Sequence, residues 1–146
     1  MKKLRILCVG KLSKSFCRDG FDEYVKRLRP FYDFSVAEIA EQPTVKKECD
    51  ELTKRMAGKE CVLLDVGGDL VSSEELAQII ESAHSRVDEL TFVIGGASGV
   101  DDSVRALCKK RISLGRVTYP HQIARLLLAE QIYRAATILN RIPYHK

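Results

Sequence analysis

The sequence predicts a single α/β domain over residues 1–146, with a mostly parallel β-sheet and helices on both of its faces. Short apolar runs rich in β-branched residues alternate along the chain with longer segments of helical periodicity. This alternation is typical of parallel strands joined by crossover helices. The length of 146 residues suits one domain, and 45% hydrophobic and 30% charged residues are typical of a globular protein.

The first part of the chain supplies two strand–helix units. Residues 4–9 are an apolar run that predicts a buried strand. Residues 15–28 have helical spacing, with Phe16 among the apolar residues of the inward face. Residues 34–39 alternate between apolar and polar side chains and predict a second strand, and residues 44–56 predict a polar outer helix.

The middle of the chain continues the pattern. Residues 61–66 predict a third strand, which the following pair of glycines breaks. Ser72 and Glu75 have the spacing of a capping box, so a helix is expected from there to about Ser85. Residues 90–94 predict a fourth strand, closed by a second pair of glycines.

The last third ends in a long helix. Residues 101–111 predict a helix whose acidic first turn and basic last turn suit the helix dipole. Residues 117–119 predict a short fifth strand, and Pro120 opens a helix to about Leu139, because proline is favoured at the first helical position.

This long helix is apolar around nearly its whole circumference, which predicts burial on every side. A small α/β domain buries only one face of an outer helix, so we expect a second copy to cover the other face in a two-fold homodimer. The alternative is that residues 1–60 cover it within the monomer.

Charge is distributed unevenly along the chain. The formal net charge is +4. Residues 1–60 carry 14 basic and 10 acidic side chains, residues 61–104 carry 1 and 9, and residues 105–146 carry 9 and 1. Basic segments favour a polyanionic partner such as RNA. We therefore expect the two basic ends to face that partner and the acidic middle to surround a cationic ligand.

Two features predict a cytoplasmic protein. No apolar run approaches the roughly 18 residues that span a membrane, and the apolar start is too short for a signal peptide. The five cysteines are odd in number, widely spaced and without a CxxC pair, which is typical of reduced thiols. Without paired cysteines or histidines we expect no metal site.

A glycine-rich turn, residues 95–99, lies between a predicted strand and a predicted helix. Its spacing is Gly-Gly-x-x-Gly rather than the Gly-x-Gly-x-x-Gly of dinucleotide-binding folds, and Asp101 and Asp102 follow it. Carboxylates at a helix start repel a pyrophosphate, so NAD, FAD and ATP are disfavoured. A ligand with adenosine and a positive centre suits this segment better; the alternative is a tight turn without a ligand.

Polar groups on the last helix are candidates for chemistry. His121 lies at its start, and Arg125 lies one turn later on the same face. The alternative for His121 is a hydrogen bond to backbone at the helix end. Glu130 and Arg134 have the spacing and order of an i, i+4 ion pair, which favours a structural role.

The chain ends in a short basic tail, residues 141–146. Arg141 and Lys146 suit RNA phosphates, Tyr144 suits base stacking, and His145 suits proton transfer. The alternative is a frayed chain end without a function.

Several motifs follow one another through the whole chain. They are VGK at 9–11, LD at 64–65, FVIGGASG at 92–99, SL at 113–114, TYPHQIAR at 118–125, EQIYRA at 130–135 and PYHK at 143–146. In this order and combination they resemble the RlmH family, the small SPOUT-class methyltransferases that modify a pseudouridine in large-subunit ribosomal RNA. No single motif is specific, but the glycine turn, the Pro-His helix start and the Tyr-His-Lys end are specific together.

The resemblance implies an α/β fold with a trefoil knot in its C-terminal part and a homodimer formed through the last helix. It also implies S-adenosylmethionine as the methyl donor, held in the knot. The residues that would line this donor site are Leu64, Gly96, Gly115, Arg116, Val117, Thr118, Tyr119 and Pro120. Family members commonly have serine at the position of Gly115, which matters little if the backbone makes the contact.

The implied reaction methylates N3 of a pseudouridine in 23S ribosomal RNA. It needs the nitrogen and the methyl carbon in line, a base for the N3 proton and a cation near the developing negative charge. We expect His145 to act as the base and Tyr144 to orient the nucleobase. Arg134 or Arg125 would stabilise the charge, and His121 would fix the loop before the last helix.

Lys11, Lys14 and Arg18 would hold the RNA together with the basic tail, and the assembled ribosome is the expected substrate. Two other classes of function stay open. One is a non-enzymatic module that binds adenosine-type nucleotides. The other is a cysteine-dependent enzyme, in which Cys8 or Cys61 would be essential.

Overall fold

All five strands of the sheet run parallel. The computed structural model describes residues 1–144, and the strand order in its sheet is β2-β1-β4-β3-β5. Each pair of neighbouring strands is parallel, which confirms the predicted α/β class. The strands are β1 (Lys3–Val9), β2 (Asp33–Ile39), β3 (Glu60–Leu70), β4 (Glu89–Ile94) and β5 (Lys110–Ser113).

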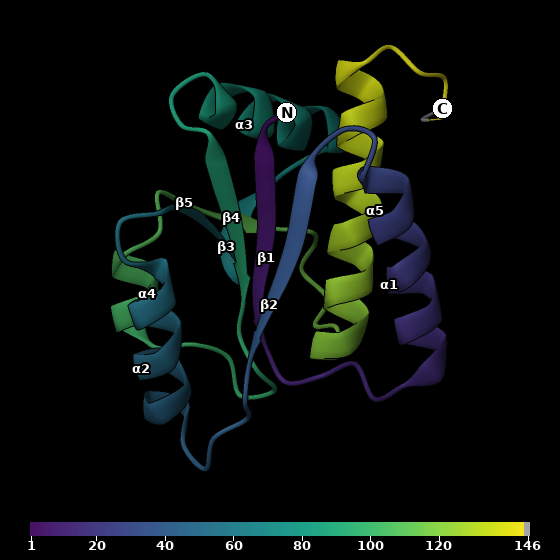
Figure 1. The fold of residues 1–146 in the computed structure, drawn as a ribbon. Helices are drawn as coiled ribbons and strands as arrows, with labels where there is room; N and C mark the ends of the chain where they lie inside the picture. Colours follow the sequence, from purple (N-terminus) through teal and green to yellow (C-terminus); the bar gives the residue numbers. More distant parts are fainter. Residues whose placement is uncertain (145–146) are drawn as a thin grey trace.

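Helices cover both faces of this sheet (Figure 1). Helices α1, α3 and α5 lie on one face, where α5 packs against both of the others, and α2 and α4 lie together on the opposite face. The helices are α1 (Ser15–Leu28), α2 (Val45–Met56), α3 (Ser73–His84), α4 (Asp102–Ala106) and α5 (His121–Leu139). The carboxyl ends of the strands and the start of α5 therefore lie at the same end of the molecule.

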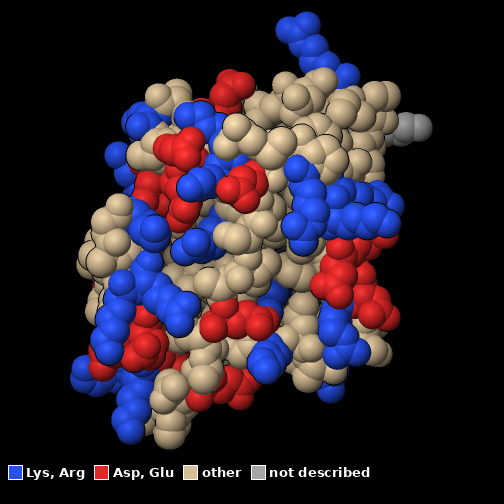
Figure 2. Space-filling model, in the orientation of Figure 1, with Lys and Arg blue, Asp and Glu red and all other residues tan. Residues whose placement is uncertain are grey.

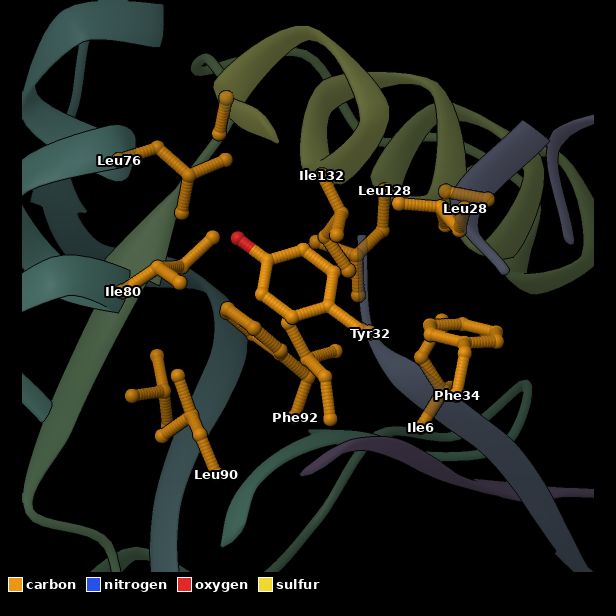
Figure 3. Packing of buried hydrophobic residues seen from close by; sticks show 14 of the residues in the cluster. Ile6, Leu28, Tyr32, Phe34, Leu76, Ile80, Leu90, Phe92, Leu128 and Ile132 are labelled. Atoms are coloured by element: carbon orange, nitrogen blue, oxygen red, sulfur yellow. The ribbon is translucent and has the colours of Figure 1, made fainter. Parts of the chain in front are cut away.

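Alternating side chains of the central strands form two separate cores. In β1, Leu4 and Ile6 pack on the side of α1, α3 and α5, whereas Leu7 and Val9 pack on the side of α2 and α4. Successive side chains of a strand point to opposite faces, which explains why residues 6–9 are apolar without alternation; Arg5, near the start of the strand, is only partly buried. Figure 3 shows the larger core, where Phe92 lies among side chains from all three helices.

The start of α3 is held as its sequence predicts. The Ser72 hydroxyl accepts a hydrogen bond from the Glu75 amide at 3.1 Å, and the Ser72 amide donates to the Glu75 carboxylate at 2.8 Å. This reciprocal capping box satisfies two backbone groups that the helix leaves without an intrahelical partner.

The predictions for the region after the fourth strand are partly wrong. Helix α4 ends at Ala106, and the basic residues assigned to its last turn form the edge strand β5 instead. Ile112 of β5 is fully buried in the larger core, which accounts for this strand. Residues 117–119 are not a strand, and Val117 is exposed.

The third strand also differs from its prediction, because β3 continues to Leu70. Leu64 and Asp69 both pair with Ile112 of β5, so residues 65–68 bulge out between them. The two glycines mark this bulge rather than the end of the strand.

Helix α1 places Phe16 outside the core, contrary to the prediction. The Phe16 side chain is 63% exposed, and the neighbouring Cys17 takes the fully buried position in the first turn. Farther along the helix, Phe21 and Leu28 are buried as expected.

The apolar circumference of α5 is largely covered within the monomer. Its buried residues, which include Leu128 and Ile132, pack in the larger core, and no residue of the helix is fully exposed. Helix α1 supplies part of this cover, as the alternative proposed. Leu127 is half-buried and does not pack in the larger core, and the homodimer stays a prediction.

The bulge in β3 yields a stability prediction for its two glycines. A Cβ atom on Gly68 would lie 2.7 Å from the carbonyl carbon of Arg111, whereas a Cβ on Gly67 would find only an Asp65 oxygen at 3.8 Å. We expect Gly68→Ala to lower the free energy of unfolding by about 1–3 kcal/mol, because backbone must move to admit the methyl group. Urea denaturation measures the change.

The matched control is Gly67→Ala, which should change the free energy of unfolding by about 0.5 kcal/mol or less. Equal losses from the two substitutions would show that the close approach of Gly68 to β5 is unimportant.

Candidate functional site

A cavity of about 630 Å³ opens at the bulge of β3 and the carboxyl end of β4. The segment between β5 and α5 lines another side of it. Seven of the eight residues that the resemblance assigns to the donor site line it; they are Leu64, Gly96, Gly115, Val117, Thr118, Tyr119 and Pro120. Arg116, the eighth, does not line it and is exposed.

The glycine-rich turn forms one wall of this cavity and closes on itself. The amide of Gly99 donates to the carbonyl of Gly96 at 3.0 Å. A Cβ atom on Gly96 would lie 2.8 Å from a carboxylate oxygen of Glu48, so the Glu48 side chain would have to move to admit it. The motif therefore forms a tight turn on the cavity wall, and its binding of a ligand stays a prediction.

The acidic middle of the chain does not form an acidic surface around the cavity. Asp65 lines the cavity, but its carboxylate lies 3.3 Å from Nε of Arg105 and 3.5 Å from a guanidinium nitrogen of Arg111. Asp69 in the bulge likewise lies 3.8 Å from Lys110. Figure 2 shows the same mixing of positive and negative side chains on one face of the molecule. The predicted separation of charge is therefore wrong in space, because the basic strand β5 lies beside the acidic end of β3.

The first turns of α5 connect the cavity to the loop after β1. His121 lines the cavity. The side-chain oxygen of Gln122 accepts hydrogen bonds from the amides of Ser13 and Lys14, both at 3.0 Å, and its nitrogen donates to the Ser13 hydroxyl at 2.8 Å. Gln122 was not among the predicted site residues, since only the fold shows that its side chain meets this loop.

Arg125 lies in the protein interior, where its side chain is 1% exposed. Its guanidinium donates to Glu38 at 2.6 Å, to the carbonyl of Gly10 at 2.8 Å and to the carbonyl of Val9 at 3.2 Å. All these contacts hold α5 against the ends of β1 and β2. The geometry therefore gives Arg125 a structural task, whereas the sequence suggested a role in charge stabilisation.

Tyr144 belongs to a polar cluster on the second half of α5, from Glu130 onward. Its hydroxyl donates to Glu130 at 2.8 Å, and Arg134 donates to the same carboxylate at 2.7 Å, which confirms the expected ion pair. The Arg134 guanidinium lies over the Tyr144 ring, 4.8 Å from its centre, and the Tyr24 hydroxyl lies 3.5 Å from that of Tyr144. Burial and the hydrogen bonds to Tyr24 and Glu130 raise the pKa of Tyr144, so the phenol stays a donor at neutral pH. His145 and Lys146 lie outside the described residues.

The cavity and the Tyr144 cluster lie at different places along α5. His121 and Ala124 line the cavity, whereas the Tyr144 hydroxyl contacts Glu130, nine residues and about 14 Å of helix beyond His121. Among the described residues of the tail, neither Arg141 nor Tyr144 lines the cavity.

The predicted RNA-binding residues fall into two groups. Lys11, Lys14 and Arg18 are all exposed, in the loop after β1 and the first turn of α1. Arg141 is also exposed but lies just beyond the far end of α5.

The cysteine thiols are poor nucleophiles. All five are free, and only Cys108 is partly accessible. Burial raises the pKa of both Cys8 and Cys61 to about 12, so these thiols are protonated at neutral pH and lack the thiolate that a cysteine nucleophile needs.

Residues 1–144 contain no cluster of three or more metal-ligating side chains. Within the same range, no helix is both long and apolar enough to cross a membrane.

Because Cys8 and Cys61 are buried and protonated, we predict that a thiol reagent modifies them slowly. We expect Ellman's reagent at pH 8 to label Cys8 and Cys61 at least about a hundredfold more slowly in the native protein than in guanidinium chloride, because both burial and protonation protect them. Mass spectrometry of the labelled peptides identifies the sites. Labelling of either thiol as fast as in the unfolded chain would support the cysteine-dependent alternative.

Comparisons with known proteins place this site in a family. The family model described as "Predicted SPOUT methyltransferase" matches residues 2–145. A protein of Desulforamulus reducens is 39% identical over the full length of both chains, and one of Geobacter metallireducens is 42% identical over 98% of each. Both are named ribosomal RNA large subunit methyltransferase H.

A solved structure supports the fold independently. The tRNA (m1G37) methyltransferase from Aquifex aeolicus superposes with a TM-score of 0.55 at 14% identity, over 90% of this chain and 69% of that chain. The full-length match to the family model and the identity to these relatives show that the chain belongs to the SPOUT methyltransferases, in the RlmH family.

Proposed function

We propose that this chain methylates N3 of a pseudouridine in 23S ribosomal RNA, with S-adenosylmethionine as donor and the assembled ribosome as substrate. The cavity carries the proposal, because it gathers seven of the eight residues that the resemblance assigns to the donor site. The names of the full-length relatives support ribosomal RNA as the substrate class. A cytoplasmic location, one domain and the C-terminal trefoil knot are part of the same proposal.

The cavity fits a donor of this kind in size and in lining. Its volume of about 630 Å³ lies within the range of about 300–1,000 Å³ that is usual for small-molecule sites. Leu64, Ile94 and Val100 offer apolar walls for a purine, and the backbone of the surrounding loops offers hydrogen-bonding groups. When bound, S-adenosylmethionine supplies a methyl group activated by the positive sulfur to which it is attached.

The Tyr144 cluster is suited to the methyl acceptor. Glu130 accepts from both Tyr144 and Arg134, so the phenol and the guanidinium keep a fixed geometry. A guanidinium beside the pyrimidine would stabilise the negative charge that builds on its carbonyl oxygens as N3 loses a proton. We assign to His145 the role of the base that accepts this proton. We assign to His121 the role of holding the loop that lines the cavity.

A second copy of the chain would complete the site. Tyr144 contacts Glu130, about 14 Å of helix beyond the cavity residue His121, so we infer that this cluster serves the cavity of another chain. A two-fold pairing of α5 helices in opposite directions puts the end of each helix beside the start of the other. The half-buried outer face of α5, with Leu127, is the surface that we assign to this homodimer.

The direct test is methyl transfer to ribosomes. Large subunits from cells that lack the modification, incubated with labelled S-adenosylmethionine and the protein, should gain label on one pseudouridine of 23S RNA. Mass spectrometry of RNA digests locates the label, and wild-type subunits, already methylated, are the control. Donor binding without transfer to any ribosomal substrate would favour the nucleotide-binding module instead.

Mixing two inactive variants tests the composite site. Thr118→Trp fills the cavity from an exposed position on its wall, and truncation after Asn140 removes the tail. Each variant alone should lose transfer. Co-refolding equal amounts should restore about a quarter of the wild-type rate, because about half of the dimers then carry one intact site.

Circular dichroism of the two variants checks that both fold. If a folded, tail-truncated protein transfers methyl groups at the wild-type rate, the tail has no part in the reaction. If both variants are inactive alone and the mixture is inactive too, each chain serves only its own cavity.

A further inference from the structure

Phe16 is an aromatic side chain that the fold leaves in solvent. It is 63% exposed in the first turn of α1, while Cys17 beside it is fully buried and Phe21 is 5% exposed. Nothing in the packing of α1 requires a large ring at this position, because the inward face of the helix is complete without it.

Exposed cations flank this ring in the sequence. Residues 11–18 contain Lys11, Lys14 and Arg18 and no carboxylate, and all three cations are exposed. Among the described residues none of the three has an ion-pair partner within 4.0 Å, in contrast to the cations of β5. Phe16 therefore lies within a short positive segment whose charges are available to a ligand.

The fold holds this segment beside the candidate donor cavity. Gln122 binds the amides of Ser13 and Lys14, and the adjacent His121 lines the cavity. Gly20, one turn after Phe16 on the same side of α1, approaches Leu126 of α5 so closely that an added Cβ would lie 3.0 Å from its Cδ1. Phe16 is thus on the side of α1 that faces α5, near the start of that helix.

We propose that Phe16 stacks on a base of the RNA substrate next to the methylated nucleotide, while Lys14 and Arg18 bind the flanking phosphates. This inference rests on the proposed function. Aromatic side chains with cations beside them are typical of single-stranded RNA sites, where the ring stacks on a base and the cations contact the backbone. A protein partner is a poorer match, because the cores of protein interfaces are depleted in lysine.

A tryptophan at this position tests stacking directly. The chain contains no tryptophan, so Phe16→Trp introduces a single fluorophore at the proposed contact. Titration with unmodified large ribosomal subunits, or with a single-stranded RNA oligonucleotide, should quench its emission in a saturable manner. The control is Leu107→Trp, at an exposed position beside α4 on the other face of the sheet, whose emission should stay unchanged.

Kinetics give a second measurement. Phe16→Ala should raise the KM for large subunits about 5- to 150-fold, the effect expected for loss of one stacked base, and leave donor affinity unchanged. Phe16→Tyr keeps an aromatic ring and should stay within about threefold of wild type, whereas Phe16→Leu, apolar but not aromatic, should resemble the alanine variant.

Several results would overturn the inference while the proposed function stands. One is normal transfer by Phe16→Ala; another is full activity of Phe16→Leu. A third is fluorescence of the Phe16→Trp variant that shifts with protein concentration alone, which would place the side chain between two copies of the chain. Absence of transfer by the wild-type protein would instead refute the proposed function.

Discussion

A buried guanidinium holds the last helix to the strand ends on which the cavity is built. Arg125 donates hydrogen bonds to Glu38 of β2 and to the carbonyls of Val9 and Gly10 at the end of β1. In the interior these protein groups take the place of water as partners of the guanidinium. Arg125 is 1% exposed and Glu38 35% exposed, so removing Glu38 would leave a charge buried in the interior without its carboxylate partner. The position of α5 in turn fixes Gln122, the loop that Gln122 binds, and the segment that lines the cavity. Both the donor side and the RNA side of the proposed site therefore depend on one side chain that touches neither ligand.

The bulge in β3 has a comparable effect on the other side of the cavity. Four residues leave the ladder between Leu64 and Asp69, and this turns Asp65 toward Arg105 and Arg111. The acidic and basic segments of the sequence neutralise each other along this edge of the sheet. The cavity is then bordered by paired charges, backbone and apolar side chains, an environment that accepts an adenosine without requiring a strongly charged ligand.

Local sequence patterns predict much of the fold. The features that they miss depend on contacts between parts of the chain that are distant in sequence. The buried strands β1 and β4 and helices α1, α2 and α3 are predicted nearly to the residue, since apolar periodicity and the Ser72 cap are local properties. Strand β5 is short, lies at the edge and is rich in cations, so its sequence resembles a helix end; its partner β3 is distant in sequence. Phe16 has the spacing of an inward residue, but its side chain is 63% exposed, and the helix periodicity alone does not show where the core ends. At the site, the motifs locate the residues of the cavity wall, whereas the tasks of Gln122 and Arg125 depend on contacts across more than a hundred residues of chain.

The length of α5 has a further consequence for the proposed enzyme. On the proposed function, a newly made monomer would carry its donor cavity at the first turn of this helix and its acceptor groups around Glu130, about 14 Å of helix away, and would not bring the two together. Competence for methyl transfer would then arise only when two folded chains meet. A rigid helix in this role works as a spacer that keeps an activated methyl group from side reactions until assembly is complete.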